Sequence, residues 1–204
     1  MERVDEASGL RARKRTRIKL MVQAEALKLF GRKGYEQTTV DDIAHAAAMS
    51  PRTFFRYFPT KEDVVLWDEF DDLPFEETWS KGEGDHPVPR LVTTIRYMVG
   101  ELYRRDPELL LTRFRLAYTV PEVRARFLDQ TFNVIGPYYA QIADAVGVSP
   151  DDLRLAVIVA TLFGAMLVAM ERWVRRDGKD DLVQLFDEAM AIVAGGLPEL
   201  RPTS

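Results

Sequence analysis

Cationic and hydroxyl side chains gather between residues 39 and 61, at spacings that suit the reading of DNA. An arginine can form two hydrogen bonds to guanine, and a threonine offers a hydroxyl and a methyl group to base edges. Tyrosine, lysine and the free N–H groups of a helix N-terminus suit phosphate oxygens. The segment therefore predicts a DNA-binding surface made of Thr39, Ser50, Pro51, Arg52, Thr53, Arg56, Tyr57 and Lys61.

Two short helices joined by a turn would position these side chains. The first starts at Thr39, and Asp42 three residues later completes a pattern similar to a capping box. The second starts after Ser50, a favourable N-cap, with Pro51 in the first helical position, and Pro59 ends it. This pattern is typical of a helix-turn-helix, which places its second helix in the DNA major groove.

The second helix of the pair has two different faces. Phe54 and Phe58 lie four residues apart and are expected to pack against the preceding helices. Arg52, Thr53 and Arg56 then point the other way. Arginines on a helix are often ordinary surface residues, but their place opposite an aromatic core face, after a capped turn, favours DNA binding.

A longer helix is predicted before the pair, over residues 16–32. Val22, Ala26, Leu29 and Phe30 form one apolar stripe along it, and Gly34 suits the left-handed conformation that ends a helix. The residues at its start are basic. They form either a disordered solubilising tail or part of an arm over residues 1–15 that reaches the minor groove or the DNA backbone: Arg11, Arg13, Lys14, Arg15 and Arg17.

Composition and charge narrow the function further. The chain of 204 residues has no cysteine and two histidines, which excludes disulfides and thiolate metal sites and leaves little for a zinc site or a histidine-based triad. Residues 1–61 hold 13 basic and 7 acidic residues, whereas residues 62–204 hold 15 and 25. A basic head on an acidic body suits a polyanion-binding module joined to a module with another task, although charges also cluster by chance.

The remainder of the chain shows only helical patterns. After a helix that begins near residue 60 and continues to about residue 70, and a loop over residues 81–89, helices are expected at about 90–105, 107–119, 122–146, 151–176 and 181–194. The sequence therefore predicts an all-α protein with a three-helix DNA-binding domain over residues 1–60 and a helical domain over residues 61–204.

Two features bear on the location of the protein. The uncharged run over residues 155–170 is shorter than the ~18–20 residues that a membrane span needs, so a buried helix is expected there. The N-terminus has no apolar segment typical of a secretory signal, so a cytoplasmic protein is expected.

The segment over residues 22–65 resembles the N-terminal domain of TetR-family transcriptional regulators. The resemblance rests on many coupled positions, among them Ala26–Phe30 in the first helix and the whole run from Thr53 to Glu62. It implies a homodimer that binds a palindromic DNA operator and a C-terminal domain that binds a small-molecule effector. It also implies a regulator, most often a repressor, rather than an enzyme. The family's usual DNA contacts match Thr39, Pro51, Arg52, Thr53, Tyr57 and Lys61, with Arg56 as an addition.

Two positions depart from the family pattern. Ala48 stands where a turn glycine is usual, and it costs ~1 kcal/mol if the turn requires a positive φ. Phe55 stands where tyrosine is usual, which removes one phenol that could bond to phosphate. This version of the motif resembles an actinobacterial subgroup that includes mycofactocin-type regulators responsive to acyl-CoA.

The last two expected helices, over residues 151–176 and 181–194, look like the dimer surface. The first is apolar almost all round and must be covered on several sides, either by a two-fold partner in a four-helix bundle or within the monomer.

For the effector, aromatic residues and one arginine on the apolar side of its helix are candidates, although aromatics at this spacing also form cores and the arginine can have a structural partner: Trp79, Arg113, Phe114, Tyr118 and Phe163. No cofactor or metal ion is expected.

Two other functions compete with the regulator. One is a helical-bundle enzyme, for which Glu76, Glu77, Asp85 and His86 are the nearby residues with acid–base potential, without the Glu-x-x-His pairs of a di-metal bundle. The other is an organiser that binds DNA without regard to sequence. Equal affinity for all duplexes would favour the organiser.

Overall fold

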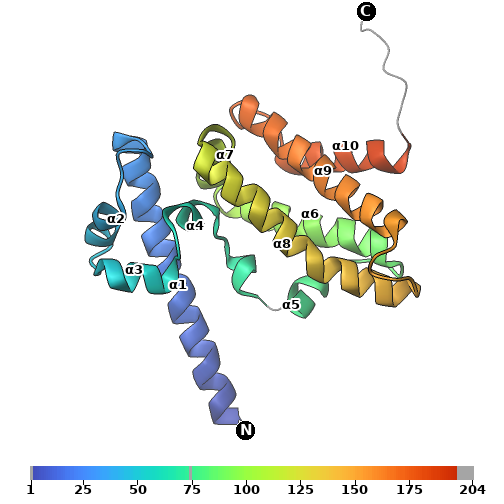
Figure 1. The fold of residues 1–204 in the computed structure, drawn as a ribbon, viewed down its shortest axis with the longest axis horizontal. Helices are drawn as coiled ribbons and strands as arrows, with labels where there is room; N and C mark the ends of the chain where they lie inside the picture. Colours follow the sequence, from blue (N-terminus) through green and yellow to red (C-terminus); the bar gives the residue numbers. More distant parts are fainter. Residues whose placement is uncertain (1, 74, 197–204) are drawn as a thin grey trace, which may run out of the picture. The chain divides into compact units, whose positions relative to one another are not determined.

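The computed structural model describes residues 2–73 and 75–196, without the side chains of residues 2–11, 72, 75, 132, 134, 135, 137 and 138. Every regular element in this part of the chain is a helix (Figure 1), which confirms the all-α fold. The chain divides into two compact units. Unit 1 comprises Met1–Asp72 and Leu116–Phe127, and unit 2 comprises Leu73–Arg115 and Leu128–Ser204. Unit 1 thus includes residues on both sides of the boundary expected at residue 60.

Unit 1 is built on one long helix, α1 (Glu2–Lys33). The helix start predicted at residue 16 is wrong, because the backbone is helical from Glu2. Glu, Ala, Leu, Arg and Lys dominate the first 15 residues and favour helix, and the acidic residues among them lie near the positive end of the helix dipole. The helix ends as predicted, with Gly34 at φ 83°.

The core of unit 1 forms where α1 meets α2 (Val40–Ala46) and α3 (Pro51–Tyr57). Val22 and Ala26 of α1 and Phe54 of α3 are fully buried, and Phe58 directly after α3 is 1% exposed. The rings of Phe54 and Phe58 lie 5.9 Å apart, which confirms that these two residues form the core face of α3. This packing fixes the orientation of the opposite, outward face of α3.

The next helix, α4 (Lys61–Leu66), is shorter than predicted. The expected helix to about residue 70 stops at Leu66, and a 3₁₀ turn, η1 (Glu69–Asp72), follows. Local side chains explain the break. The Asp68 carboxylate accepts a hydrogen bond from the Phe70 N–H at 2.9 Å, and Asp71 accepts one from the Asp68 N–H at 3.0 Å. Such side-chain bonds compete with the helical backbone bonds.

Unit 2 holds the other helices. The sequence did not predict the short α5, whereas the five longer helices agree with the expected ranges to within three residues: α5 (Phe75–Trp79), α6 (Pro87–Arg105), α7 (Pro107–Thr119), α8 (Pro121–Val146), α9 (Leu153–Arg175) and α10 (Leu182–Ala194). The end of α7 and the start of α8 belong to unit 1.

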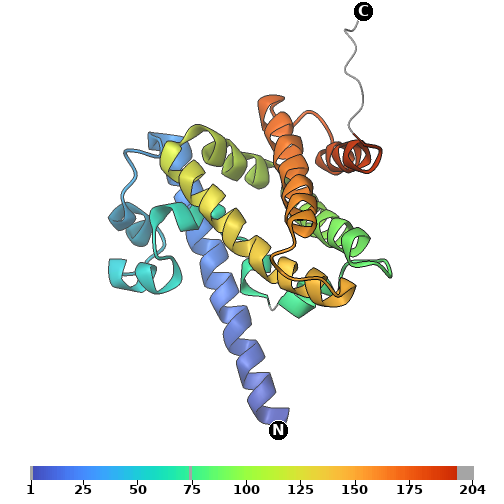
Figure 2. The same cartoon turned by 45° about the vertical axis from the view of Figure 1, so that its right-hand side comes forward.

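Helices α9 and α10 both pack against α6. Tyr103 of α6 meets Trp173 of α9 edge to face at 5.8 Å, and Arg96 of α6 forms a two-pronged ion pair with Asp187 of α10, with its shorter N–O distance 2.7 Å. Trp173, Leu182 and Phe186 are almost fully buried there. These contacts hold α9 and α10 side by side (Figure 2).

Helix α9 is long and apolar enough to cross a membrane by length and composition alone, with a mean hydropathy of 2.2. One such helix is weak evidence for a membrane span, because the core helix of a soluble protein passes the same test. Only 33% of this apolar stretch is buried inside the protein. The expected coverage on several sides is therefore incomplete within one chain.

Candidate nucleic-acid interface and effector region

The turn between α2 and α3 is held by caps at both ends. Ser50 Oγ accepts a hydrogen bond from the Thr53 N–H at 3.1 Å, with Pro51 at the start of α3 as predicted. At the end of α2, the Ala48 N–H donates to His45 and the Met49 N–H donates to Ala44. This is a Schellman motif. Its left-handed position is Ala48, at φ 51°, so the positive φ that the family pattern implies is present although the glycine is absent.

Helix α3 presents the predicted reading residues on its outer face. Arg52 and Arg56 are exposed, and Thr53 is half-buried. The Thr53 hydroxyl lies 2.9 Å from the Ser50 hydroxyl, so these two residues share a hydrogen bond in the free protein. The guanidinium groups of Arg52 and Arg56 are therefore accessible on the outer face of α3. Phe55 is 51% exposed beside them.

The start of α2 is organised around Asp42. Thr39 and Asp42 form the predicted capping box, and Lys33 lies 2.7 Å from the same carboxylate. Hydrogen bonds from Lys33 and Thr39 hold the pKa of Asp42 well below its usual range. The sequence predicts that the helix N-terminus at Thr39 contacts phosphate. In the structure it already binds the Asp42 carboxylate, and Lys33 neutralises the charge of that carboxylate.

Lys61 lies at the start of α4, where its ammonium group is already engaged. Its Nζ donates to the carbonyls of Tyr35 at 3.1 Å and Thr38 at 3.2 Å, and lies 3.9 Å from the centre of the Tyr35 ring. An ammonium group has three donors, so one N–H is left for a phosphate. The structure thus adds a structural role to Lys61, that of fastening the loop between α1 and α2.

The same loop is fastened to α4 a second time. The Tyr35 hydroxyl donates to the Glu62 carboxylate. Burial of Tyr35 and this hydrogen bond to Glu62 raise the pKa of the phenol well above its usual value. Burial would raise the pKa of Glu62, but the bonds from Tyr35 and Thr60 and the charge of Lys61 lower it overall.

Three further polar residues that sequence reasoning missed position α4 on α1 and α8. Gln23 Nε2 donates to the carbonyls of Val64 and Trp67, both at 2.8 Å, and satisfies the end of α4. Asp63 is 6% exposed and accepts from Arg126 Nε of α8 at 2.8 Å. The sequence could have indicated that Gln23 is buried, because it lies among Val22, Ala26 and Phe30 on the core side of α1.

Tyr57 is half-buried at the end of α3, between two guanidinium groups. Arg56 lies 5.2 Å and Arg15 of α1 lies 5.9 Å from the centre of its ring. Both distances are within the range of cation–π attraction. The N-terminal basic segment and the reading helix therefore meet at Tyr57.

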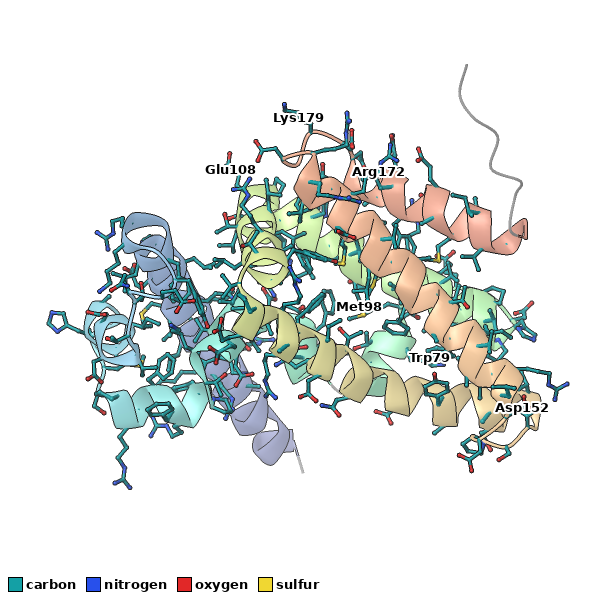
Figure 3. All side chains as sticks on the ribbon, turned by 45° about the horizontal axis from the view of Figure 1, so that its top comes forward. Trp79, Met98, Glu108, Asp152, Arg172 and Lys179 are labelled. Carbon is teal, nitrogen blue, oxygen red and sulfur yellow. The ribbon has the colours of Figure 1, made fainter. Side chains whose placement is uncertain are left out.

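The predicted effector residues do not all fall in one unit. Trp79 of α5, Arg113 and Phe114 of α7, and Phe163 of α9 belong to unit 2, whereas Tyr118 belongs to unit 1, where its ring lies 6.1 Å from that of Phe127. Arg113 is 8% exposed and has an interaction within the protein. Figure 3 shows Trp79 amid the helices of unit 2, together with Met98 of α6.

The two expected dimer helices expose apolar side chains. Leu153, Val157 and Val168 of α9 are 76%, 55% and 60% exposed, and Ile192 of α10 is 52% exposed. Gly164 lies on α9 between Val157 and Val168, and a Cβ atom built there would meet nothing within 4 Å. The spacing of Leu153, Val157, Gly164 and Val168 places them on one face of α9, an exposed apolar surface with a small residue within it.

The residues that would support an enzyme are scattered on the surface. Glu76, Glu77 and Asp85 are exposed, and His86 caps α6 by accepting a hydrogen bond from the Val88 N–H at 3.3 Å. Over residues 2–73 and 75–196, no group of three or more His, Asp or Glu side chains is placed to hold a metal ion.

Comparisons with known proteins cover both units. Residues 24–66 match the profile of bacterial regulatory proteins of the TetR family, and residues 86–198 match that of the MftR C-terminal domain. The HTH-type transcriptional regulator TcmR of Streptomyces glaucescens is 33% identical over 203 residues, with 95% of this chain and 87% of TcmR aligned. The HTH-type transcriptional repressor KstR of Mycobacterium tuberculosis is 26% identical, with 92% of this chain and 84% of KstR aligned.

The fold has a solved counterpart as well. The crystal structure of FadR from Thermus thermophilus, a TetR-family transcriptional repressor in complex with lauroyl-CoA, aligns with a TM-score of 0.56 and 25% identity over 91% of this chain and 98% of that one. The capped helix-turn-helix of unit 1, the helical unit 2 and the two profile matches lead to one conclusion: the chain belongs to the TetR family of bacterial transcriptional regulators, with a C-terminal domain of the MftR type.

Proposed function

We propose that this regulator is a cytoplasmic repressor that binds a palindromic DNA operator as a homodimer and releases it when a small, largely hydrophobic effector binds unit 2. The observation that carries the proposal is the outer face of α3, where Arg52 and Arg56 are exposed opposite the buried Phe54. A rigid helix with a fixed core face presents its reading residues in one orientation, as major-groove recognition requires. The proposed activity is binding, with no chemical step.

The apolar surface on α9 and α10 supports the homodimer. Leu153, Val157, Val168 and Ile192 would be covered by the same surface of a second copy, in an isologous two-fold interface. The space above Gly164 lets the two α9 helices approach closely. A two-fold dimer presents two copies of α3, so its operator is expected to be palindromic with half-sites about one helical turn apart.

Replacing Arg52 with alanine is expected to relax base preference at one position of each half-site. Removing a bidentate hydrogen bond to a base costs ~1–3 kcal/mol per half-site. Lys61→Ala is expected to weaken operator and scrambled DNA about equally, because its remaining N–H would contact phosphate. Gel-shift titration of both variants against a duplex selected from a random pool measures this. Equal wild-type affinity for all duplexes would instead identify a sequence-blind DNA organiser.

For the effector, we propose a long-chain acyl-CoA thioester. The similarity to a FadR that binds lauroyl-CoA supports this class. So does the composition of unit 2, where the cationic Arg113 is 8% exposed and the apolar residues Leu110 and Phe114 of the same helix are buried as well. An acyl chain would occupy apolar surroundings, and a phosphate or thioester oxygen would join or replace the present partner of Arg113.

Replacing Arg113 with glutamine is expected to raise the lauroyl-CoA concentration needed to release operator DNA about 10-fold, because the variant cannot form one charge-assisted hydrogen bond. The matched control is Arg115→Gln on the same helix, where Arg115 is exposed and paired with Asp177. Release is followed by fluorescence anisotropy of labelled operator. The acyl-CoA proposal fails if lauroyl-CoA leaves the wild-type complex intact, and the role of Arg113 fails if both variants respond like wild type.

A further inference from the structure

The N-terminal half of α1 extends beyond the core of unit 1. Among the described side chains, the first buried residue of the helix is Lys19, and Arg13, Lys14, Arg15 and Arg17 before it are all exposed. Figures 1 and 2 both show the N-terminal part of α1 extending beyond α3. Residues 13–17 include no apolar residue, so burial of apolar side chains explains neither their helical conformation nor their charge.

The basic residues share one surface. An open hollow of unit 1 is lined by Arg13, Lys14, Arg17 and the stem of Ile18. Several positive charges on one helix repel each other and destabilise it, and a bound anion would remove this repulsion. A polyanion that offers charges at regular spacing would suit the row formed by residues one turn apart, such as Arg13 and Arg17.

Tyr57 connects α1 to the reading helix through Arg15. The guanidinium groups of Arg15 and Arg56 both lie close to the centre of the Tyr57 ring, at 5.9 and 5.2 Å. One guanidinium belongs to α1 and the other to α3 (Pro51–Tyr57), so the basic half of α1 meets α3 at the ring. Arg15 is two residues from Arg13 and from Arg17, so those two side chains start from the other side of α1 and reach past the helix on the far side from α3. A duplex seated on α3 therefore has its backbone near the basic half of α1.

The helical conformation decides which part of the duplex is contacted. An α-helix with its side chains is about 10–12 Å wide, whereas the minor groove of B-DNA is about 6 Å wide. The basic segment therefore cannot enter the minor groove as an extended arm would. Its side chains can reach phosphates along the rim of the groove, and such contacts carry no base preference.

On these grounds we propose that residues 13–17 of α1 form a second DNA-binding element, a rigid helical rail that binds backbone phosphates flanking each operator half-site. The rail rests on the DNA-binding function proposed above and adds to it a source of affinity without specificity. Arg13, Lys14 and Arg17 bind phosphate directly. Arg15 sets the rail against Tyr57 and so fixes its position relative to α3.

The double variant Arg13→Gln/Arg17→Gln tests this phosphate binding. The slope of log affinity against log salt is expected to fall by ~0.9 for each phosphate that the variant no longer neutralises, up to about 3.6 for a dimer, and affinity at 0.15 M salt is expected to fall at least ~10-fold for operator and scrambled DNA alike. The matched control is Lys81→Gln/Lys179→Gln, which removes the same charge from exposed positions of unit 2. An unchanged slope, or a slope changed equally by the control, overturns the rail.

Thr16→Pro tests the helix while it keeps every charge. Proline is tolerated in the first turn of a helix and breaks the interior, so α1 would restart near residue 16 and Arg13, Lys14 and Arg15 would no longer have a fixed register. The affinity of Thr16→Pro for DNA is expected to fall about as much as that of the double variant. If Thr16→Pro instead binds DNA as tightly as wild type, the segment acts as a flexible arm and not as a rigid helix. If wild type itself prefers no DNA sequence, the proposed function fails while the salt slopes still report on the rail.

Discussion

Replacing Gly164 with glutamine is expected to separate the proposed homodimer and lower operator affinity about 100-fold or more. The new side chain has room within one chain, because nothing lies within 4 Å of a Cβ atom at this position. It also raises helix propensity, since glycine in a helix interior costs ~1 kcal/mol relative to alanine. In the dimer, the same side chain would stand between the two α9 helices. Separate protomers bind the two half-sites independently, so they lose the high effective concentration that a dimer gives its second α3 once the first is bound.

Light scattering after size exclusion measures the mass, and a titration of the operator measures affinity. The matched control is Gly31→Gln on α1, another helical glycine with open space above it, outside the proposed interface. The control is expected to remain dimeric. A Gly164→Gln variant that keeps the dimer mass at micromolar concentration would place the two-fold interface elsewhere on unit 2.

The helix-turn-helix could be predicted because its signals are local in the sequence. Ser50 and Pro51 begin α3, and Thr39 and Asp42 begin α2, through bonds between residues at most three apart. The spacing of Phe54 and Phe58 then assigns the core face, and the outward face follows. Ala48 is another case of local determination: the backbone hydrogen bonds of the turn, rather than the residue type, give it its left-handed conformation.

The contacts that sequence reasoning missed join residues far apart in the chain. The motif predicts Lys61 as a phosphate ligand, but Tyr35 and Thr38, more than 20 residues earlier, use two of its three donors. Periodicity groups Tyr118 with the effector residues because it follows Phe114 by one helical turn, yet the end of α7 belongs to unit 1. Helix periodicity gives the direction of a side chain on its own helix and not the neighbour that it meets.

The start of α1 shows a different limit. Its composition favours helix, but basic residues without an apolar stripe are equally typical of a disordered tail. The structure decides for the helix, and the approach of Arg15 to Tyr57 connects it to α3. Neither of these two residues carries a sequence pattern that would link positions 15 and 57.

Asp63→Ala is expected to destabilise unit 1 by about 3 kcal/mol, the second large effect. One oxygen of the Asp63 carboxylate accepts two hydrogen bonds from Thr60, from its N–H and its hydroxyl, both at 3.0 Å. The other oxygen accepts from Arg126 at 2.8 Å. The first pair caps α4, worth ~1 kcal/mol. The second is an ion pair in which the side chain of Asp63 is 8% exposed and that of Arg126 is 37% exposed, so its removal costs about 2 kcal/mol, less than for a fully buried pair.

The matched control for this variant is Asp42→Ala. Thr39 and Asp42 form the same capping box at α2, but the side chain of Asp42 is 36% exposed and has no partner on α8 among its described contacts. A much smaller destabilisation is therefore expected, and the difference between the two variants measures the tie to α8. The thermal midpoint of Asp63→Ala should fall by about 6–12 °C.

We expect Asp63 to matter for function as well, because its partner Arg126 lies in the segment Leu116–Phe127 of unit 1, which is continuous in sequence with unit 2 on both sides. Arg126 on this segment bonds to the residue that caps α4, so a movement of α8 would be felt at the start of α4. A double-mutant cycle of Asp63→Asn and Arg126→Gln isolates this pair. A coupling energy near zero, both in stability and in the acyl-CoA concentration that releases DNA, would show that α4 is held by Gln23 and Lys61 without the contact to α8.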